Sequence, residues 1–182
     1  TAASFSYPAG VTVDGAGNVY VADTVSDLIR KIAPDGTVTT LAGSASPVGV
    51  AVDSAGNVHF ADRGNPRIRK IAADGAVTTV AGSGSQGSAD GVGTAASFNS
   101  PHGITVDGAG NVYVADTGNH LIRKVAPDGT VTTIAGSGSQ GSADGVGTAA
   151  SFNSPVGVAV DSADRKSTRL NSSHVSESRM PS

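Results

Sequence analysis

A block that begins with glycine and ends with aspartate occurs four times in this chain of 182 residues, at 10–14, 49–53, 103–107 and 157–161. Self-similarity on this scale indicates a repeat architecture, in which each small unit buries its apolar side chains only against its neighbours. We therefore expect the units to stack, with one core between each adjacent pair.

Each repeat has the pattern of four short antiparallel strands. In the third repeat, residues 103–106 and 111–115 alternate or are rich in β-branched side chains, and a Gly/Asp cluster lies between them. Residues 120–125 and 130–134 form a second pair, joined by the turn sequence Pro127-Asp128-Gly129. Helical periodicity is missing, and four strands in about 40 residues match a propeller blade. The sequence therefore predicts an all-β fold.

The third repeat, NSPHGITVDGAGNVYVADTGNHLIRKVAPDGTVTTIAGSG at residues 99–138, resembles the NHL repeat. This resemblance implies a β-propeller of four-stranded antiparallel blades, commonly six in a ring, so that the present chain would be a propeller fragment with an incomplete ring. On this basis we expect a propeller domain over residues 1–163. Its parts are blades at about 6–46, 47–100 and 101–154, and the first strand of a fourth blade at 155–161.

The last nineteen residues, 164–182, break the repeat pattern and contain the only Glu and the only Met of the chain. They resemble a sequencing-library adapter translated in frame. We expect this tail to be disordered and artefactual, and we exclude it from the interpretation of the fold.

Residues 1–163 carry 8 Lys and Arg against 13 Asp, a formal charge of -5. This balance disfavours a nucleic acid as partner, which makes RNA binding the weakest of three functional hypotheses. The absence of cysteine excludes disulfides and thiolate metal sites but leaves the compartment open, with secretion or cell-surface display as the working hypothesis. No run approaches the roughly 20 apolar residues that a membrane span requires.

Two long insertions separate the repeats. The string GSGSQGSADGVGTAASFNSP occurs at residues 82–101 and again, unchanged, at 136–155. We interpret it as a Gly/Ser spacer that Phe98 and Phe152 pin to the blades. The alternative is a loop that contacts a ligand, because loops of this length are often functional.

Charged residues recur at fixed positions in every repeat, which favours a structural role. An arginine on the third strand shares a face with apolar side chains, so it needs an acceptor at the end of the second strand. The expected pairs are Asp23 with Arg30, Asp62 with Arg69, and Asp116 with Arg123. The aspartates of the Gly-rich hairpins are expected to cap their own turns rather than to bind calcium; they are Asp14, Asp53, Asp107 and Asp161.

Function is expected where the repeats differ, in the loops between the second and third strands. These loops should emerge at one edge of the blades together with the insertions, and loops on a rigid scaffold often bind partners. The leading hypothesis is a non-catalytic scaffold that binds a protein or carbohydrate, with no cofactor or metal. Exposed terminal blades are also expected to self-associate. The candidate binding residues are Arg63, Asn65, His102, Asn119 and His120.

The alternative hypothesis is part of a metal-dependent propeller enzyme of the lyase or lactonase type. Related peptide-amidating lyases carry a histidine beside the first-strand glycine, and His102 is similar. A catalytic zinc site needs three convergent protein ligands, however, and the matching positions hold Ala9, Val48 and Val156. These residues alone therefore predict no catalytic activity.

Overall fold

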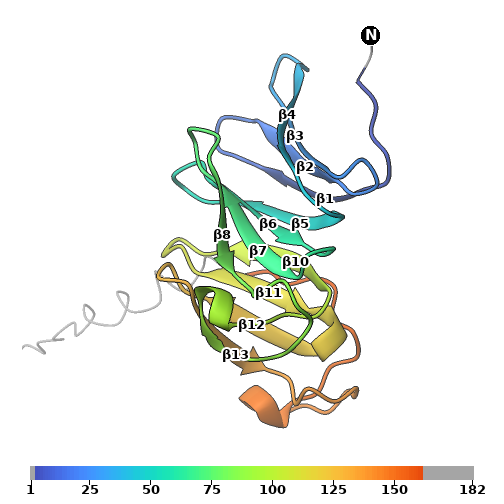
Figure 1. Cartoon of the computed structure of the whole chain (residues 1–182), viewed down its shortest axis with the longest axis vertical. Coiled ribbons are helices and arrows are strands. Elements are labelled where there is room, and N and C mark those ends of the chain that lie inside the picture. Colours follow the sequence, from blue (N-terminus) through green and yellow to red (C-terminus); the bar gives the residue numbers. More distant parts are fainter. Residues whose placement is uncertain (1–2, 162–182) are drawn as a thin grey trace, which may run out of the picture.

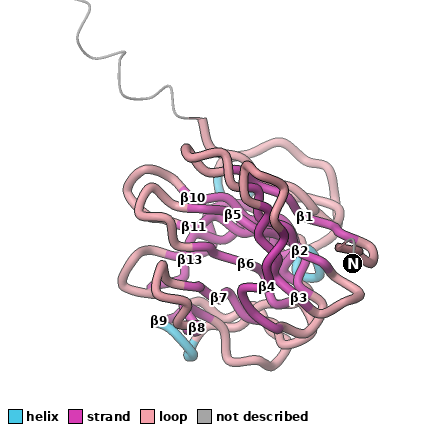
Figure 2. The backbone as a smooth tube through the Cα atoms, turned by 90° about the horizontal axis from the view of Figure 1, so that it is seen from above, coloured by secondary structure: helices cyan, strands magenta, loops and turns pink. Residues whose placement is uncertain are grey.

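Three antiparallel sheets lie side by side in this protein (Figures 1 and 2). The computed structural model describes residues 3–161, and the tail predicted at 164–182 lies outside the described residues. The four strands of each blade follow the order of the sequence, so every blade is a simple meander, and an earlier segment of the chain adds a fifth strand at the edge of the third sheet. This arrangement confirms the predicted all-β fold of four-stranded blades.

The bounds of the elements are as follows. The first sheet contains β1 (Pro8–Val13), β2 (Val19–Asp23), β3 (Leu28–Ile32) and β4 (Val38–Gly43). The second contains β5 (Pro47–Val52), β6 (Val58–Asp62), β7 (Arg67–Ile71) and β8 (Val77–Ala81). The third contains β10 (Pro101–Val106), β11 (Val112–Asp116), β12 (Leu121–Val125), β13 (Thr130–Ala135) and an added strand, β9 (Gly91–Val92). Single 3-10 turns form η1 (Gly93–Ala95), η2 (Thr117–Asn119) and η3 (Gly147–Ala149).

The helical elements within residues 3–161 are single 3-10 turns, and none of them could span a membrane.

The hairpin aspartates close the turns between the first two strands of each blade. Asp53 Oδ1 accepts hydrogen bonds from the backbone N–H groups of Ala55 and Asn57, at 3.0 and 2.9 Å, and its Oδ2 accepts one from the Asn57 side chain at 2.8 Å. Asp14 and Asp107 make the same set of bonds. These three aspartates are therefore turn caps, as the sequence predicted.

The first strands of the three blades, β1, β5 and β10, pack in that order around a common axis. Their approach is so close that only glycine fits at the contact: a Cβ on Gly49 would lie 2.2 Å from the His102 carbonyl oxygen. The same holds for Gly10 against the Val48 carbonyl, also at 2.2 Å. The repeated glycine of the sequence thus sets the distance between blades.

Apolar side chains fill the two spaces between the sheets. Phe60 and Ile29 are fully buried in the space between the first and second sheets, and Val114 and Ile68 are fully buried in the space between the second and third. The second sheet thus contributes to a core on both of its faces, which is why the repeats need neighbours.

Two segments differ from the boundaries expected from the sequence. The insertion after β8 was assigned to the second blade, but β9 within it pairs with β13 and extends the third sheet. Residues 155–161, expected as the first strand of a fourth blade, are not in a strand, because the described residues contain no second strand of that blade with which they could form a ladder. Gly103 N–H nevertheless donates to the Val156 carbonyl at 3.0 Å, so this segment packs against β10.

Candidate functional site

The loops between the second and third strands gather at one edge of the blades. We call this edge, formed by residues 24–27, 63–66 and 117–120, the loop face. Backbone hydrogen bonds tie these loops to the segments before the first strands, as in Gly64 N–H to the Ala45 carbonyl and Gly118 N–H to the Asn99 carbonyl, both at 2.9 Å. The insertions begin and end at this edge, as expected from antiparallel strand order.

Arg63 and His102 are the polar candidates that the loop face leaves available. Arg63 follows β6 directly and is exposed, while His102 lies half-buried in β10. Burial, and then the positive charge of Arg63, lower the pKa of His102, whereas a hydrogen bond to the backbone of Val156 opposes the shift. Burial and the nearby charge of the exposed Arg63 thus both favour the neutral imidazole.

The other three candidates make contacts that hold the loops in place. Asn119 Nδ2 donates to the Gly87 carbonyl and to Asp116 Oδ2, each at 2.7 Å. His120 Nδ1 accepts the backbone N–H of Ser154 at 3.0 Å. The Asn65 side chain lies 3.5 Å from both carboxylate oxygens of Asp62, so it is nearest to an internal group as well.

All three predicted pairs of aspartate and arginine are formed, with unequal geometry. Arg30 to Asp23 measures 3.5 Å and Arg69 to Asp62 measures 3.6 Å, whereas Arg123 to Asp116 measures 2.8 Å. The exposed fractions of the three arginine side chains are 15%, 26% and 0% in that order. The third blade therefore holds its arginine far more tightly than the other two.

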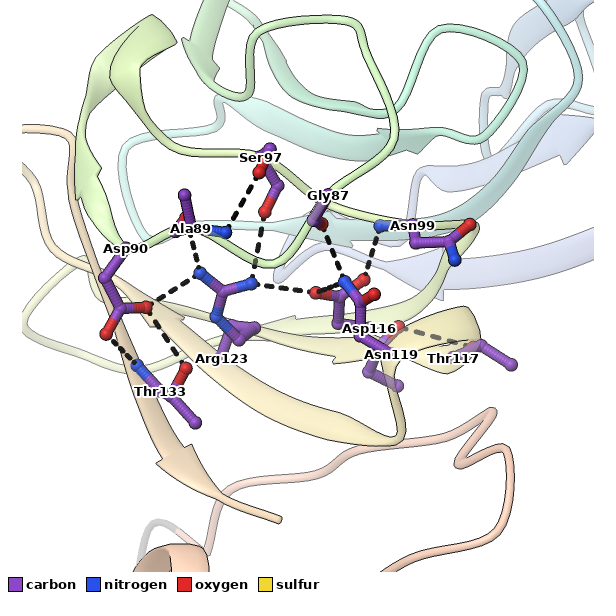
Figure 3. A network of polar contacts seen from close by, with 11 residues as sticks. Gly87, Ala89, Asp90, Ser97, Asn99, Asp116, Thr117, Asn119, Arg123 and Thr133 are labelled. Atoms are coloured by element: carbon purple, nitrogen blue, oxygen red, sulfur yellow. Dashed lines mark hydrogen bonds and ion pairs between the residues drawn. The ribbon is translucent and has the colours of Figure 1, made fainter. Parts of the chain in front are cut away.

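The insertion between β8 and β10 explains this difference (Figure 3). Arg123 Nη2 donates to the Ala89 carbonyl at 2.9 Å and to Asp90 Oδ1 at 2.7 Å, and Nη1 donates to the Ser97 carbonyl at 3.1 Å. The guanidinium also lies 5.2 Å from the centre of the Phe98 ring. We call the insertion at residues 82–101 the clasp, because these contacts hold Arg123 of the third blade. The insertion is therefore more than a spacer held by one aromatic side chain.

Asp90 is the residue that the sequence analysis missed. It is the only acidic residue in the inserted string, and its Oδ2 and Oδ1 also accept hydrogen bonds from the N–H and Oγ1 of Thr133, both at 3.1 Å. A single carboxylate in a Gly/Ser-rich insertion was the available signal. Its partner could not be identified from spacing, because Arg123 lies 33 residues away.

The described residues do not bring together a metal site. Within residues 3–161 no three His, Cys, Asp or Glu side chains converge. His59 lies 3.1 Å from Asp53 at the base of a hairpin, where Tyr20 and Tyr113 make the equivalent contacts in the other blades. His102 therefore belongs to no group of three such side chains within residues 3–161.

Comparison with known proteins identifies similar repeats. The family model "NHL repeat" matches residues 5–31 and 98–125. NHL repeat-containing protein 2 of Bos taurus is 48% identical over 56 residues, which is 30% of this chain and 8% of that protein. The chain therefore spans only a small part of this relative's length.

Two solved structures share the fold at low identity. An auxiliary nutrient binding protein from Bacteroides thetaiotaomicron has a TM-score of 0.72 and 22% identity, covering 84% of this chain and 42% of that one. A streptogramin B lyase structure has a TM-score of 0.54 and 17% identity, covering 68% and 39%. Similarity at this level indicates a propeller fold and does not distinguish a binding protein from an enzyme.

Proposed function

From the premise that this chain is built of NHL repeats folded as propeller blades, we propose that it is a non-catalytic module that binds a protein or a carbohydrate at the loop face. The observation that carries the proposal is the presence of an exposed Arg63 and a half-buried His102 at that edge, where burial and the charge of Arg63 lower the pKa of the imidazole. A guanidinium offers several donors in a fixed geometry, and a neutral imidazole whose N–H donates to the Val156 carbonyl offers one acceptor. This combination suits carboxylates, backbone carbonyls and sugar hydroxyls.

The remaining candidates have a supporting part in this proposal. Asn119 and His120 hold the insertion and the segment before Pro155, and Asn65 lies against Asp62. In our proposal they fix the shape of the loops, and Arg63 and His102 contact the ligand. The structural similarity to the nutrient binding protein is a precedent for binding on this fold, and at 22% identity it does not indicate the ligand.

The metal-dependent alternative receives less support. Three protein ligands are needed for a catalytic zinc, and His102 belongs to no group of three potential ligands among residues 3–161. The residues at the equivalent positions of the other repeats, Ala9, Val48 and Val156, cannot bind a metal through their side chains.

The proposal is tested with an array of immobilised oligosaccharides and a displayed peptide library, using the full chain. For any probe that the chain retains, Arg63→Ala and His102→Ala should each weaken binding by about tenfold or more, because each removes hydrogen bonds to the ligand. Lys124→Ala, which removes a cation from β12 near the strand end that lies away from the loop face, should leave binding unchanged. Equal retention by all four proteins would exclude the loop face as the binding site.

A further inference from the structure

The linker before the second blade is too short to form a clasp like the one that holds the third blade. Residues 44–46 join β4 to β5, whereas residues 82–100 join β8 to β10. Both segments connect consecutive blades, so the difference is a property of the repeats themselves. The arginine of the second blade, Arg69, is therefore the one whose surroundings the short linker leaves open.

Arg69 lacks the oxygen acceptors that the clasp gives to Arg123. The clasp supplies two backbone carbonyls and the Asp90 carboxylate to that guanidinium (Figure 3). Among residues 3–161, Asp62 is the only polar partner of Arg69, and the distance from Nη1 to Oδ2 is 3.6 Å. The Arg69 side chain is 26% exposed, so an acceptor from outside the chain can reach it.

The second blade has the aromatic part of the arrangement, although from a different source. In the third blade, the ring centre of Phe98 in the clasp lies 5.2 Å from the Arg123 guanidinium. In the second blade, the ring centre of Phe60 in β6 lies 5.9 Å from the Arg69 guanidinium. Phe60 is fully buried and stands at the position of Val114. The aromatic contact to Arg69 is therefore complete, and the oxygen acceptors are the part that is missing.

Arg67 adds a positive charge that the other two blades lack. It lies two residues before Arg69 on the same face of β7, where the first and third blades carry Leu28 and Leu121. Its Nη2 donates to the Ser83 carbonyl at 3.1 Å, and it has no ion pair within residues 3–161. Two guanidinium groups on one strand face favour an anionic ligand here, although the chain as a whole has a formal charge of -3.

The third blade shows where a carboxylate would lie relative to Arg67. There, Leu121, Asp90 and Thr133 line one open cavity of about 380 Å³, and Asp90 accepts hydrogen bonds from the N–H and Oγ1 of Thr133. Thr79 has the position of Thr133 in the second blade, and it is exposed. A carboxylate at the corresponding place would meet an arginine instead of a leucine, and a threonine as before.

The outer edge of the second sheet is open as well. In the third sheet, β9 of the clasp pairs with β13 through Gly91 and Val92, and Val131 of β13 is 1% exposed. Within residues 3–161 no strand pairs with the outer edge of β8, and Val77, the counterpart of Val131, is 36% exposed. Open edges of this kind accept an added strand through main-chain hydrogen bonds.

We propose that the outer edge of the second blade binds an extended acidic segment of a partner protein, in the way that the clasp binds the third blade. An aspartate of the segment accepts hydrogen bonds from Arg67, Arg69 and Thr79, and the residues after it pair with β8 at Val77. The order of aspartate, glycine and a β-branched residue, as at residues 90–92 of the clasp, fits this geometry. The partner thus supplies the acceptors that the short linker does not.

This site is different from the loop-face site. In the first blade, Thr24 has the position of Arg63, and its Oγ1 donates to the Pro47 carbonyl of the next blade at 2.7 Å. Arg63 therefore lies toward the first strand of the following blade, whereas Arg69 pairs with the outermost strand, β8. Either proposal can fail without the other.

A peptide copied from the clasp tests the proposal. We expect the full chain to bind a fluorescent peptide of residues 86–93, QGSADGVG, in an anisotropy titration, with a Kd below about 1 mM. Replacing the aspartate of the peptide by asparagine should weaken binding by about tenfold or more, because charge-assisted hydrogen bonds are lost. Amide hydrogen exchange at Val77 and Thr79 should slow when the peptide is bound.

Variants of β7 locate the site. Arg67→Leu gives this strand the residue of the other two blades, so it should fold normally and weaken peptide binding by about threefold or more. Arg69→Lys should weaken it by about tenfold, since lysine retains the charge opposite Asp62 but not the planar fork. Lys70→Gln removes the same charge from the opposite face of β7 and, as the matched control, should bind the peptide normally.

Several results would overturn the proposal. They are no saturable binding at about 1 mM peptide, equal binding of the asparagine peptide, or unchanged binding by Arg67→Leu. Displacement of the peptide by an equal concentration of acetate would leave a simple anion site. Self-association of the chain that the peptide reverses would assign the edge to a second copy, and either of these outcomes would also exclude a partner segment.

Discussion

Replacement of Asp90 by alanine should destabilise the third blade, whereas the same replacement at Asp144 should not. The two aspartates lie in identical strings of twenty residues, so local sequence effects on the unfolded chain cancel in the comparison. Asp90 accepts one hydrogen bond from Arg123 at 2.7 Å and two from Thr133 at 3.1 Å. Asp144 accepts none from the described residues, which leaves tertiary contacts as the only difference.

The magnitude follows from these bonds. A hydrogen bond to a charged group contributes roughly 1.5–3 kcal/mol and a neutral one about 1 kcal/mol. The Asp90 side chain is 50% exposed, so water replaces part of what is lost. Arg123 also keeps Asp116 at 2.8 Å, which avoids the larger penalty of an unpaired buried charge. We expect a loss of about 2–3 kcal/mol for Asp90→Ala, and a change within about 0.5 kcal/mol for Asp144→Ala.

Urea unfolding followed by circular dichroism, at a protein concentration below any association, measures these differences. Repeat proteins do not always unfold in one step, so amide hydrogen exchange provides a local measure. A loss of 2 kcal/mol corresponds to about 30-fold faster exchange at Thr133 and Ser97. Equal destabilisation by the two substitutions, or no effect at Asp90, would refute the view that the first insertion is a clasp.

Further predictions concern the blade contacts and the buried histidine. Gly49→Ala should lower the free energy of unfolding, measured with urea, by about 2 kcal/mol or more, because the added Cβ would lie 2.2 Å from the His102 carbonyl oxygen. Gly157→Ala should leave it nearly unchanged, because no atom lies within 4 Å of the added Cβ. Similar losses for the two substitutions would contradict the packing described. Burial lowers the pKa of His59, so its contribution to stability should be complete above the unfolded pKa of about 6.5 and should fall as the pH drops below that value. His59→Tyr supplies the side chain that the other blades place beside this hairpin aspartate, and it should make the free energy of unfolding less dependent on pH between 5 and 7.5. An unchanged pH profile would show that His59 is not the titrating group.

Several features of this protein are determined by the sequence alone because they depend on residues close together in the chain. The hairpin at Asp53 is closed by bonds to residues two and four positions away, and the Asp116–Arg123 pair joins adjacent strands. The period of the glycine blocks gives the blade unit, and the apolar side chains of its strands fill the spaces between adjacent blades. These local regularities explain why the fold class and the ion pairs could be predicted.

The tertiary structure decides what identical segments do. The string at residues 82–101 becomes a clasp that holds Arg123, and the same string at 136–155 surrounds an open cavity. Likewise, residues 155–161 have the sequence pattern of a strand but form none. A strand needs a hydrogen-bonding neighbour, and the sequence of the segment does not determine whether one is present. The physical reason is the same in both cases. An ion pair or a strand pairing takes its energy from the partner, and the partner's position is set by how the blades pack.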